Sequence, residues 1–268
     1  MSRVIAIANQ KGGVGKTTTA INLGAGLAVA ERRTLIVDMD PQGNATSGMG
    51  VDRSRLHGSI YDILIEDSAI ADVRIERVHF PFLDIVPSSQ DLVGAEVELV
   101  DRPRRELVLR GALEPVRDEY DYVLLDCPPS LGLLTLNTLA AADTVLIPIQ
   151  CEFYALEGLS QLLNTVRLVQ QNLNPKLQIE GVLLTMYDQR LNLSRQVADE
   201  AKEYFGSRVF KSVIPRNVRL AEAPSFGKPI VLYDILSAGA QSYLTLANEI
   251  IGHDGMPDGT LTAARGGS

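Results

Sequence analysis

Residues 11–18 read Lys-Gly-Gly-Val-Gly-Lys-Thr-Thr, a glycine-rich run that ends in a lysine and two hydroxyl side chains. Glycines allow successive backbone N–H groups to converge on phosphate oxygens, because no Cβ stands in the way. A lysine at position 16 can reach the outer phosphates of a nucleotide, and the hydroxyl at position 17 can bind Mg²⁺. The run therefore predicts a nucleoside triphosphate site that consists of Lys11, Gly12, Gly13, Val14, Gly15, Lys16, Thr17 and Thr18.

Aspartates follow two of the apolar runs, and carboxylates are the second residue type that such chemistry needs. Asp38 comes directly after residues 34–37, Asp40 follows two positions later, and Asp126 comes directly after residues 122–125. Side chains two positions apart point the same way if the backbone stays extended, so Asp38 and Asp40 can face the loop together. Asp126 has the form of a Walker B carboxylate, which orients the shell around Mg²⁺. The alternative is that each aspartate simply ends a strand, because turns favour this residue.

Short β-branched runs alternate with longer amphipathic segments along the chain, and these elements must position the loop and the carboxylates. Nearly continuous apolar strands are typical of a parallel sheet with helices on both faces, so we expect a doubly wound, mostly parallel α/β fold. Ligands of such sheets bind at the carboxyl ends of the strands. The first helix is predicted over residues 17–30, and the strands are predicted over 4–8, 34–37, 83–86, 122–125, 144–149, 179–185 and 209–214.

Composition limits the classes of protein that this chain can be. Its 268 residues are 46% hydrophobic, which is enough for a sizeable core and excludes overall disorder. The two cysteines cannot build a disulfide framework or a multi-cysteine zinc site, and they fit core thiols in a reducing cytoplasm. We find no signal-peptide pattern and no membrane-spanning apolar run. One domain is expected over residues 1–252, with a mobile tail over 253–268.

The charge of the chain is unevenly distributed. A net charge of −8 argues against a protein that coats nucleic acid through positive charge spread over its whole surface. Residues 186–228 nevertheless hold eight lysines and arginines against five acidic residues. Aromatic residues are not interleaved with these cations as in single-strand binding, so the segment is compatible with non-specific contact to duplex phosphates. The alternative is an ordinary solvated face.

The phosphate loop departs from the common pattern G-x-x-x-x-G-K-[ST]. Gln10 stands where the first glycine belongs, and Lys11 follows it. This arrangement resembles the deviant loop of the ParA/MinD group of P-loop ATPases. The stretches 38–46 (Asp-Met-Asp-Pro-Gln-Gly-Asn-Ala-Thr), 126–130 (Asp-Cys-Pro-Pro-Ser) and 214–229 are similar to chromosomal ParA (Soj) proteins. The resemblance runs from about Arg3 to Ile251.

The resemblance implies an ATPase with weak basal activity, in which Lys11, Lys16 and Asp40 form the catalytic set. Lys11 would reach across a nucleotide-sandwich homodimer to the phosphates of the partner subunit. Charge that develops on the transferred phosphoryl oxygens would then be compensated only when two ATP-loaded subunits meet. Asp40 would position or activate the attacking water. A solvated loop cation is the alternative for Lys11.

Further site residues follow from the same resemblance. Thr17, Asp38 and Asp126 would hold Mg²⁺, with Asp126 acting through water and Asp38 supporting the network around Thr17. Pro215 and Asn217 would lie near the adenine.

The resemblance also implies partners. The ATP-bound homodimer would bind double-stranded DNA non-specifically, and a ParB-type protein would stimulate hydrolysis, so that chromosome origins are moved or positioned. The protein would be cytoplasmic and associated with the nucleoid, without membrane contact. The residues expected to contact DNA are Arg190, Arg219, Arg216, Lys211 and Arg195.

Three other functions fit parts of the pattern. A MinD-like positioning ATPase needs a C-terminal amphipathic helix, and the tail has only Met256 and Leu261 as large apolar residues. A relative of the nitrogenase iron protein would use Cys127 and Cys151 to bridge a cluster between subunits. A ParA-like protein that positions another cargo would carry the same motifs.

Overall fold

The computed structural model describes residues 2–152 and 157–253, and these residues contain one seven-stranded sheet. Its strand order is β3-β2-β4-β1-β5-β6-β7, and every strand pair is parallel. The predicted α/β fold with a mostly parallel sheet is therefore confirmed. The strands are β1 (Arg3–Ile7), β2 (Thr34–Asp38), β3 (Leu83–Val86), β4 (Tyr122–Asp126), β5 (Thr144–Gln150), β6 (Gln178–Tyr187) and β7 (Val209–Pro215).

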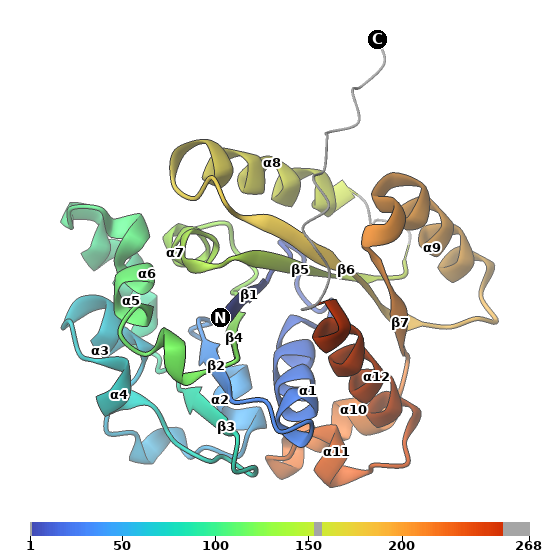
Figure 1. The fold of residues 1–268 in the computed structure, drawn as a ribbon, viewed down its shortest axis with the longest axis horizontal. Helices are drawn as coiled ribbons and strands as arrows, with labels where there is room; N and C mark the ends of the chain where they lie inside the picture. The colour runs from blue at the N-terminus through green and yellow to red at the C-terminus, as the bar shows by residue number, and fades with distance from the viewer. Residues whose placement is uncertain (1, 153–156, 254–268) are drawn as a thin grey trace.

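Helices cover both faces of the sheet (Figure 1). In β1, Val4 and Ala6 pack into one core while Ile5 and Ile7 pack into the other, as the two-residue period of a strand requires. Helices α3 to α9 cover the first face, and helices α1, α2, α10, α11 and α12 cover the second. The helices are α1 (Lys16–Val29), α2 (Asn44–Gly48), α3 (Ile60–Ile65), α4 (Ile70–Val73), α5 (Leu92–Glu98), α6 (Val108–Leu113), α7 (Leu133–Ala141), α8 (Glu157–Asn172), α9 (Asn192–Phe205), α10 (Val218–Glu222), α11 (Ile230–Tyr233) and α12 (Ala238–His253).

The predicted elements agree with the structure to within a few residues at their ends. All seven predicted strands occur, and the first helix begins at Lys16, directly after the glycine-rich run. Helix α12 runs to His253, so the first residue of the tail expected over 253–268 is helical, and the rest of that tail lies outside the described residues. No helix in the described part of the chain combines the length and apolarity that crossing a membrane requires. The single domain over residues 1–252 stays a prediction.

Two loops cross in close contact at Gly50 and Gly227. Both glycines have positive φ angles, 75° and 60°. A Cβ on Gly50 would lie 2.7 Å from the carbonyl oxygen of Gly227. The His79 ring nitrogen Nε2 lies 2.9 Å from the carbonyl oxygen of Met49 and 2.8 Å from that of Gly227. The crossing therefore ties the end of α2 to the loop that precedes α11.

We expect Gly50→Ala to destabilise the fold by about 2–4 kcal/mol, because alanine disfavours the left-handed conformation and its methyl group would overlap the Gly227 carbonyl. Gly111→Ala is the matched control, since a Cβ there meets nothing within 4 Å and the residue lies in helix α6. That control should be neutral or stabilise by up to about 1 kcal/mol. Urea unfolding measures both variants. A wild-type midpoint for Gly50→Ala would contradict the prediction.

A candidate nucleotide site at the carboxyl ends of the strands

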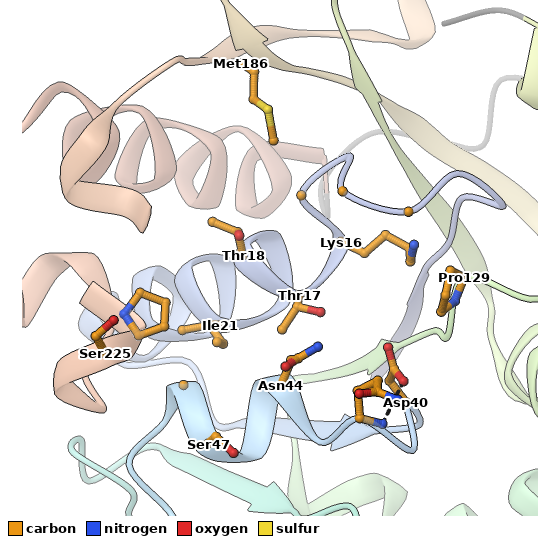
Figure 2. A pocket seen from close by; sticks show the side chains of 16 residues that line it. Lys16, Thr17, Thr18, Ile21, Asp40, Asn44, Ser47, Pro129, Met186 and Ser225 are labelled. Carbon is orange, nitrogen blue, oxygen red and sulfur yellow. Dashed lines mark hydrogen bonds between the residues drawn. The ribbon is translucent and has the colours of Figure 1, made fainter. Parts of the chain in front are cut away.

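A cavity of about 620 Å³ opens at the carboxyl ends of the strands, where the sequence predicts the site (Figure 2). This volume is in the range of small-molecule and cofactor sites. Residues of the glycine-rich loop, the start of α1, the segment after β2, the loop after β4, the end of β6 and the turn before α11 surround it (Figure 2). Its lining is Gly12, Gly13, Gly15, Lys16, Thr17, Thr18, Ile21, Asp40, Gln42, Asn44, Ser47, Gly48, Pro129, Met186, Pro224 and Ser225.

The glycine-rich loop has the geometry of a phosphate cradle. Gly13 and Gly15 adopt positive φ angles of 75° and 90°, which a residue with a Cβ rarely takes. The Thr185 hydroxyl donates a hydrogen bond to the Val14 carbonyl oxygen at 2.8 Å and anchors the loop to β6. Helix α1 begins at Lys16, so its positive N-terminal end faces the loop. This arrangement can bind a phosphate chain.

The two lysines of the loop have different surroundings. Lys16 is 7% exposed, and its Nζ donates a hydrogen bond to the Lys11 carbonyl oxygen at 3.1 Å. Burial lowers the pKa of Lys16, while the negative charge of Asp126 opposes this shift. The Lys11 ammonium instead forms an ion pair with Glu152, which follows β5. In a single subunit, Lys11 is therefore held by a carboxylate of its own chain.

Asp126 presents an unpaired carboxylate. The residue is fully buried, and neither carboxylate oxygen has a hydrogen-bond partner among the described residues. Burial, followed by the charge of Asp38, raises the pKa of Asp126 well above its ordinary value, and the nearby Thr17 hydroxyl partly opposes this shift. A buried carboxylate without partners is costly and calls for a cation or donor that completes the site.

The residues around Asp126 fit a Mg²⁺ ion. No group of three or more His, Cys, Asp or Glu side chains within residues 2–152 and 157–253 could hold a metal by itself. Mg²⁺ takes few protein ligands and is completed by water and substrate phosphates, so one carboxylate and the Thr17 hydroxyl are a fitting donor set.

Asp38, unlike Asp126, accepts hydrogen bonds with both of its carboxylate oxygens. Its Oδ2 accepts hydrogen bonds from the Thr46 N–H at 2.8 Å and from the Thr46 hydroxyl at 2.7 Å, and its Oδ1 accepts one from the Asp40 N–H at 3.2 Å. Burial raises the pKa of Asp38 to about 6, although these hydrogen bonds act to lower it. Its hydrogen bonds thus fix the segment from Asp40 to Thr46 and do not involve Thr17. A role for Asp38 near the metal stays a prediction.

Asp40 faces the cavity (Figure 2). Its Oδ1 accepts a hydrogen bond from the Gln42 N–H at 2.9 Å, and its backbone carbonyl accepts one from the Ser88 hydroxyl at 2.8 Å. The backbone is therefore held from two sides while the carboxylate is presented to the cavity. This is the geometry that a residue positioning a water molecule needs.

The cavity is also lined by three residues that are not among those predicted to bind the nucleotide. They are Met186, Pro224 and Ser225. Pro215 pairs with Tyr187 across the sheet, and Asn217 precedes α10 with a buried Oδ1 that has no partner among the described residues. The role of these two residues beside a base stays a prediction.

Met186 has a φ angle of 50°, which is rare for a side chain of this size. Pro224 and Ser225 reach the cavity because the loop before α11 folds back onto α2. Neither feature has a local sequence signal, so sequence reasoning missed these residues.

The residues predicted to contact DNA are mostly exposed, but two of them are already paired. Arg190 is 84% exposed and donates two hydrogen bonds to the Asp188 carboxylate, at 2.9 and 2.6 Å. Arg219 pairs with Glu222 at 2.9 Å and with Asp234 at 3.5 Å. The pKa of Asp188 is lowered to about 2, mainly by its hydrogen bonds with Arg190 and also by the charge of Arg216. Both arginines therefore lie near the same carboxylate.

The remaining two predicted cations lie on other elements. Arg195 is in the first turn of α9 and contacts the Asn192 side chain. Lys211 is near the start of β7, where its N–H donates to Glu249 of α12 at 2.7 Å. The structure therefore brings Arg190 and Arg216 together at the ends of β6 and β7, and places Lys211 toward the opposite end of β7.

Both cysteines are free and buried. Burial raises the pKa of Cys127 to about 12 and that of Cys151 to about 11. Both thiols are therefore protonated at neutral pH and behave as core residues, as expected from the sequence.

Comparison with known proteins gives consistent results over most of the chain. Residues 2–179 match a family of proteins described as an AAA domain. The chromosome partitioning protein ParA of Myxococcus xanthus is 59% identical over 254 residues, which cover 95% of this chain and 89% of that protein. The sporulation initiation inhibitor protein Soj of Bacillus subtilis is 60% identical over 250 residues, which cover 93% and 98%.

A solved structure is similar over the same range. The crystal structure of cobyrinic acid a,c-diamide synthase from Mycobacterium smegmatis with bound ADP and magnesium has a TM-score of 0.82 and 38% sequence identity. The match covers 94% of this chain and 95% of that one.

Proposed function

Because this chain belongs to the ParA/Soj family of chromosome-partitioning ATPases, we propose that it hydrolyses ATP with Mg²⁺ and acts as an ATP-dependent homodimer on DNA. The ATP-bound dimer binds double-stranded DNA non-specifically on the nucleoid. A ParB-type partner stimulates hydrolysis, and hydrolysis releases the protein from DNA. Repeated binding and release move or position the chromosome origins. One observation carries the proposal: a phosphate cradle with Lys16 faces a buried carboxylate, Asp126, that lacks a partner among the described residues.

Different residues of the cavity bind the phosphates, hold Mg²⁺ and orient the attacking water. The loop amides and Lys16 bind the phosphates, while Thr17 and Asp126 hold Mg²⁺, which when bound neutralises charge on the phosphate oxygens. Asp40 accepts a hydrogen bond from the attacking water and orients it toward the outermost phosphorus. The hydrogen bonds to Gln42 and Ser88 keep this carboxylate in place.

Lys11 couples hydrolysis to dimerisation. Its ammonium is paired with Glu152 of its own chain, so a subunit alone does not direct this charge to the phosphates. In the dimer, Lys11 exchanges Glu152 for the phosphates of the partner subunit, where charge develops during transfer. This exchange accounts for the weak basal activity that we expect from a single subunit.

DNA binding by a single subunit should be poor, because Arg190 and Arg219 are paired with carboxylates. Two subunits side by side double the number of phosphate contacts, and affinity rises steeply with that number. The decisive experiment measures the affinity for a duplex of random sequence with ATP, with ADP and without nucleotide. Equal affinity in all three states would exclude an ATP-controlled switch.

We expect Arg190→Glu to weaken DNA binding of the ATP-bound protein by about tenfold or more, because each dimer loses two cations and gains two anions. The slope of log affinity against log salt concentration should fall by about 2. Fluorescence anisotropy over a salt series measures both quantities.

Arg110→Glu is the matched control, because Arg110 is exposed on α6 and its substitution makes the same charge change on another part of the surface. The ATP-dependent dimer should form normally in both variants. An equal loss of DNA binding in the two variants would assign the effect to net charge and not to Arg190.

A further inference from the structure

A ring of hydrogen bonds lies behind the wall of the cavity and passes through the backbone of Asp40. Its members are Asp38 at the end of β2, Asp40 just after it, Thr46 in α2 and Ser88 in the chain after β3. All four residues are buried, and of these four Asp40 alone lines the cavity. Thr46 and Ser88 can therefore act on a bound nucleotide only through their neighbours. We call this set the Asp40 ring.

Each hydrogen bond of the Asp40 ring has a fixed direction. The Asp40 N–H donates to Asp38 Oδ1 at 3.2 Å, and the Thr46 hydroxyl donates to Asp38 Oδ2 at 2.7 Å. The Ser88 N–H donates to the Thr46 hydroxyl oxygen at 2.9 Å, and the Ser88 hydroxyl donates to the Asp40 carbonyl oxygen at 2.8 Å. Since an N–H group only donates and a carbonyl oxygen only accepts, each hydroxyl proton has one place in the ring.

Ser88 holds Asp40 from a different part of the sheet. The Asp40 carbonyl oxygen also accepts the Gly43 N–H at 2.8 Å, but that bond lies within the same turn of the chain. The Ser88 hydroxyl comes from 48 positions away and joins this turn to the chain after β3. A second acceptor for this hydroxyl, the Ser89 carbonyl oxygen, is farther away, at 3.5 Å. The peptide groups of Asp40 are therefore held at the N–H by Asp38 and at the carbonyl by Ser88.

The Thr46 hydroxyl links the two sides of the ring. It accepts a hydrogen bond from Ser88 and donates one to Asp38, whose Oδ2 also accepts the Thr46 N–H at 2.8 Å. A methyl group in place of this hydroxyl would break both side-chain bonds and leave the buried Ser88 N–H without its acceptor. Because a buried donor without a partner is costly, the chain around Ser88 would shift. Thr46 thus keeps Ser88 where it reaches Asp40.

We propose that Ser88 and Thr46 are positioning residues for hydrolysis, which fix the backbone of Asp40 so that its carboxylate is aimed at the attacking water. This inference rests on the role of Asp40 in the proposed function. Such orientation lowers the barrier to hydrolysis and contributes little to ATP binding, because the phosphate loop is not part of the ring. Loss of either hydroxyl should therefore change the rate and spare the affinity.

The first variant is Ser88→Ala, which removes the hydroxyl and keeps the N–H that donates to Thr46. The rate of hydrolysis at saturating ATP should fall about three- to tenfold, while the affinity for ATP stays within about twofold of the wild type. Thr46→Val should lower the rate about tenfold or more, because it breaks two bonds of the ring. Thr46→Ser keeps the hydroxyl and should hydrolyse ATP within about twofold of the wild-type rate. Single-turnover hydrolysis and titration with a fluorescent ATP analogue measure the two quantities.

Ser212→Ala is the matched control for the loss of a buried hydroxyl. Ser212 is buried in β7, at the sheet edge opposite to β3, and its hydroxyl donates to Glu249 at 2.6 Å. Urea unfolding should show a similar loss of stability in Ser212→Ala and Ser88→Ala, but hydrolysis should slow only in Ser88→Ala. An equal fall in rate in the two variants would assign the effect to stability and would overturn the inference.

A double variant tests whether Ser88 acts through Asp40. Ser88→Ala should not slow hydrolysis further in the Asp40→Ala background, because the carboxylate that Ser88 positions is then absent. A further fall as large as the one that Ser88→Ala causes in the wild-type background would show that Ser88 acts on another group. That result would also overturn the inference.

The outcomes separate the inference from the proposed function. Hydrolysis at the wild-type rate in Asp40→Ala would overturn the role of Asp40 and the inference with it. Slow hydrolysis in Asp40→Ala, together with wild-type rates in Ser88→Ala and Thr46→Val, would overturn the inference alone. If circular dichroism shows that Thr46→Val does not fold, the rate of Ser88→Ala decides between these results.

Discussion

Lys16→Ala should weaken ATP binding about 100-fold or more, which corresponds to about 2.7 kcal/mol or more. Lys16 is nearly buried at the start of α1, and its ammonium bonds to the loop carbonyl of Lys11 at 3.1 Å. The ammonium thus both closes the loop and supplies the buried positive charge beside the phosphates. Its removal leaves Asp126, whose pKa burial raises, without its nearby cation. Phosphate binding should suffer from both losses.

Titration with a fluorescent ATP analogue measures this effect, and circular dichroism checks that the variant is folded. Lys176→Ala is the control, because Lys176 is an exposed lysine that precedes β6, at the amino end of the sheet. ATP-dependent dimerisation and DNA binding should disappear together with nucleotide binding. Wild-type affinity for ATP in Lys16→Ala would remove this residue from the phosphate site.

The sequence predicts the sheet and the phosphate loop because their signals are local. Runs such as residues 122–125 are continuous and apolar since helices cover both sheet faces. The glycines of the loop mark a backbone that only residues without a Cβ adopt easily, and Gly13 and Gly15 do have positive φ angles. Asp40 and Asp126 are found because each follows such a strand.

The parts that the sequence does not predict depend on contacts between distant segments. Lys11 pairs with Glu152, 141 positions away in the chain, and no local pattern indicates this pair. Met186 enters the cavity through an unusual φ angle, which its neighbours in sequence do not signal. Val93 and Val97 of α5 are apolar in the sequence, but only the structure shows that they are 65% and 75% exposed.

The structure also changes the interpretation of the excess of basic residues over residues 186–228. Two of the five acidic residues in this segment, Asp188 and Glu222, contact the two arginines that were expected to lead DNA binding. Phosphates must therefore compete with carboxylates for Arg190 and Arg219. Such exposed pairs are weak individually, so a polyanion that engages several arginines at once can displace them. This competition favours binding by the dimer over binding by one subunit.

Asp40→Ala should lower the rate of ATP hydrolysis by about 100-fold or more while the ATP-bound dimer persists. The substitution removes only the carboxylate, because Ser88 and Asp38 bond to the backbone of residue 40 and keep their partners. Only the Gln42 N–H loses its acceptor, and it lies at a partly exposed position.

Because the groups that bind phosphate are untouched in Asp40→Ala, nucleotide and DNA binding should resemble those of the wild type, and the partner should no longer stimulate turnover. Single-turnover hydrolysis combined with sedimentation in ATP separates these properties. Asp72→Ala, an exposed aspartate on α4, is the control. Hydrolysis at the wild-type rate in Asp40→Ala would show that another group orients the water. Loss of the dimer would instead mean that the Asp40 carboxylate holds the two subunits together.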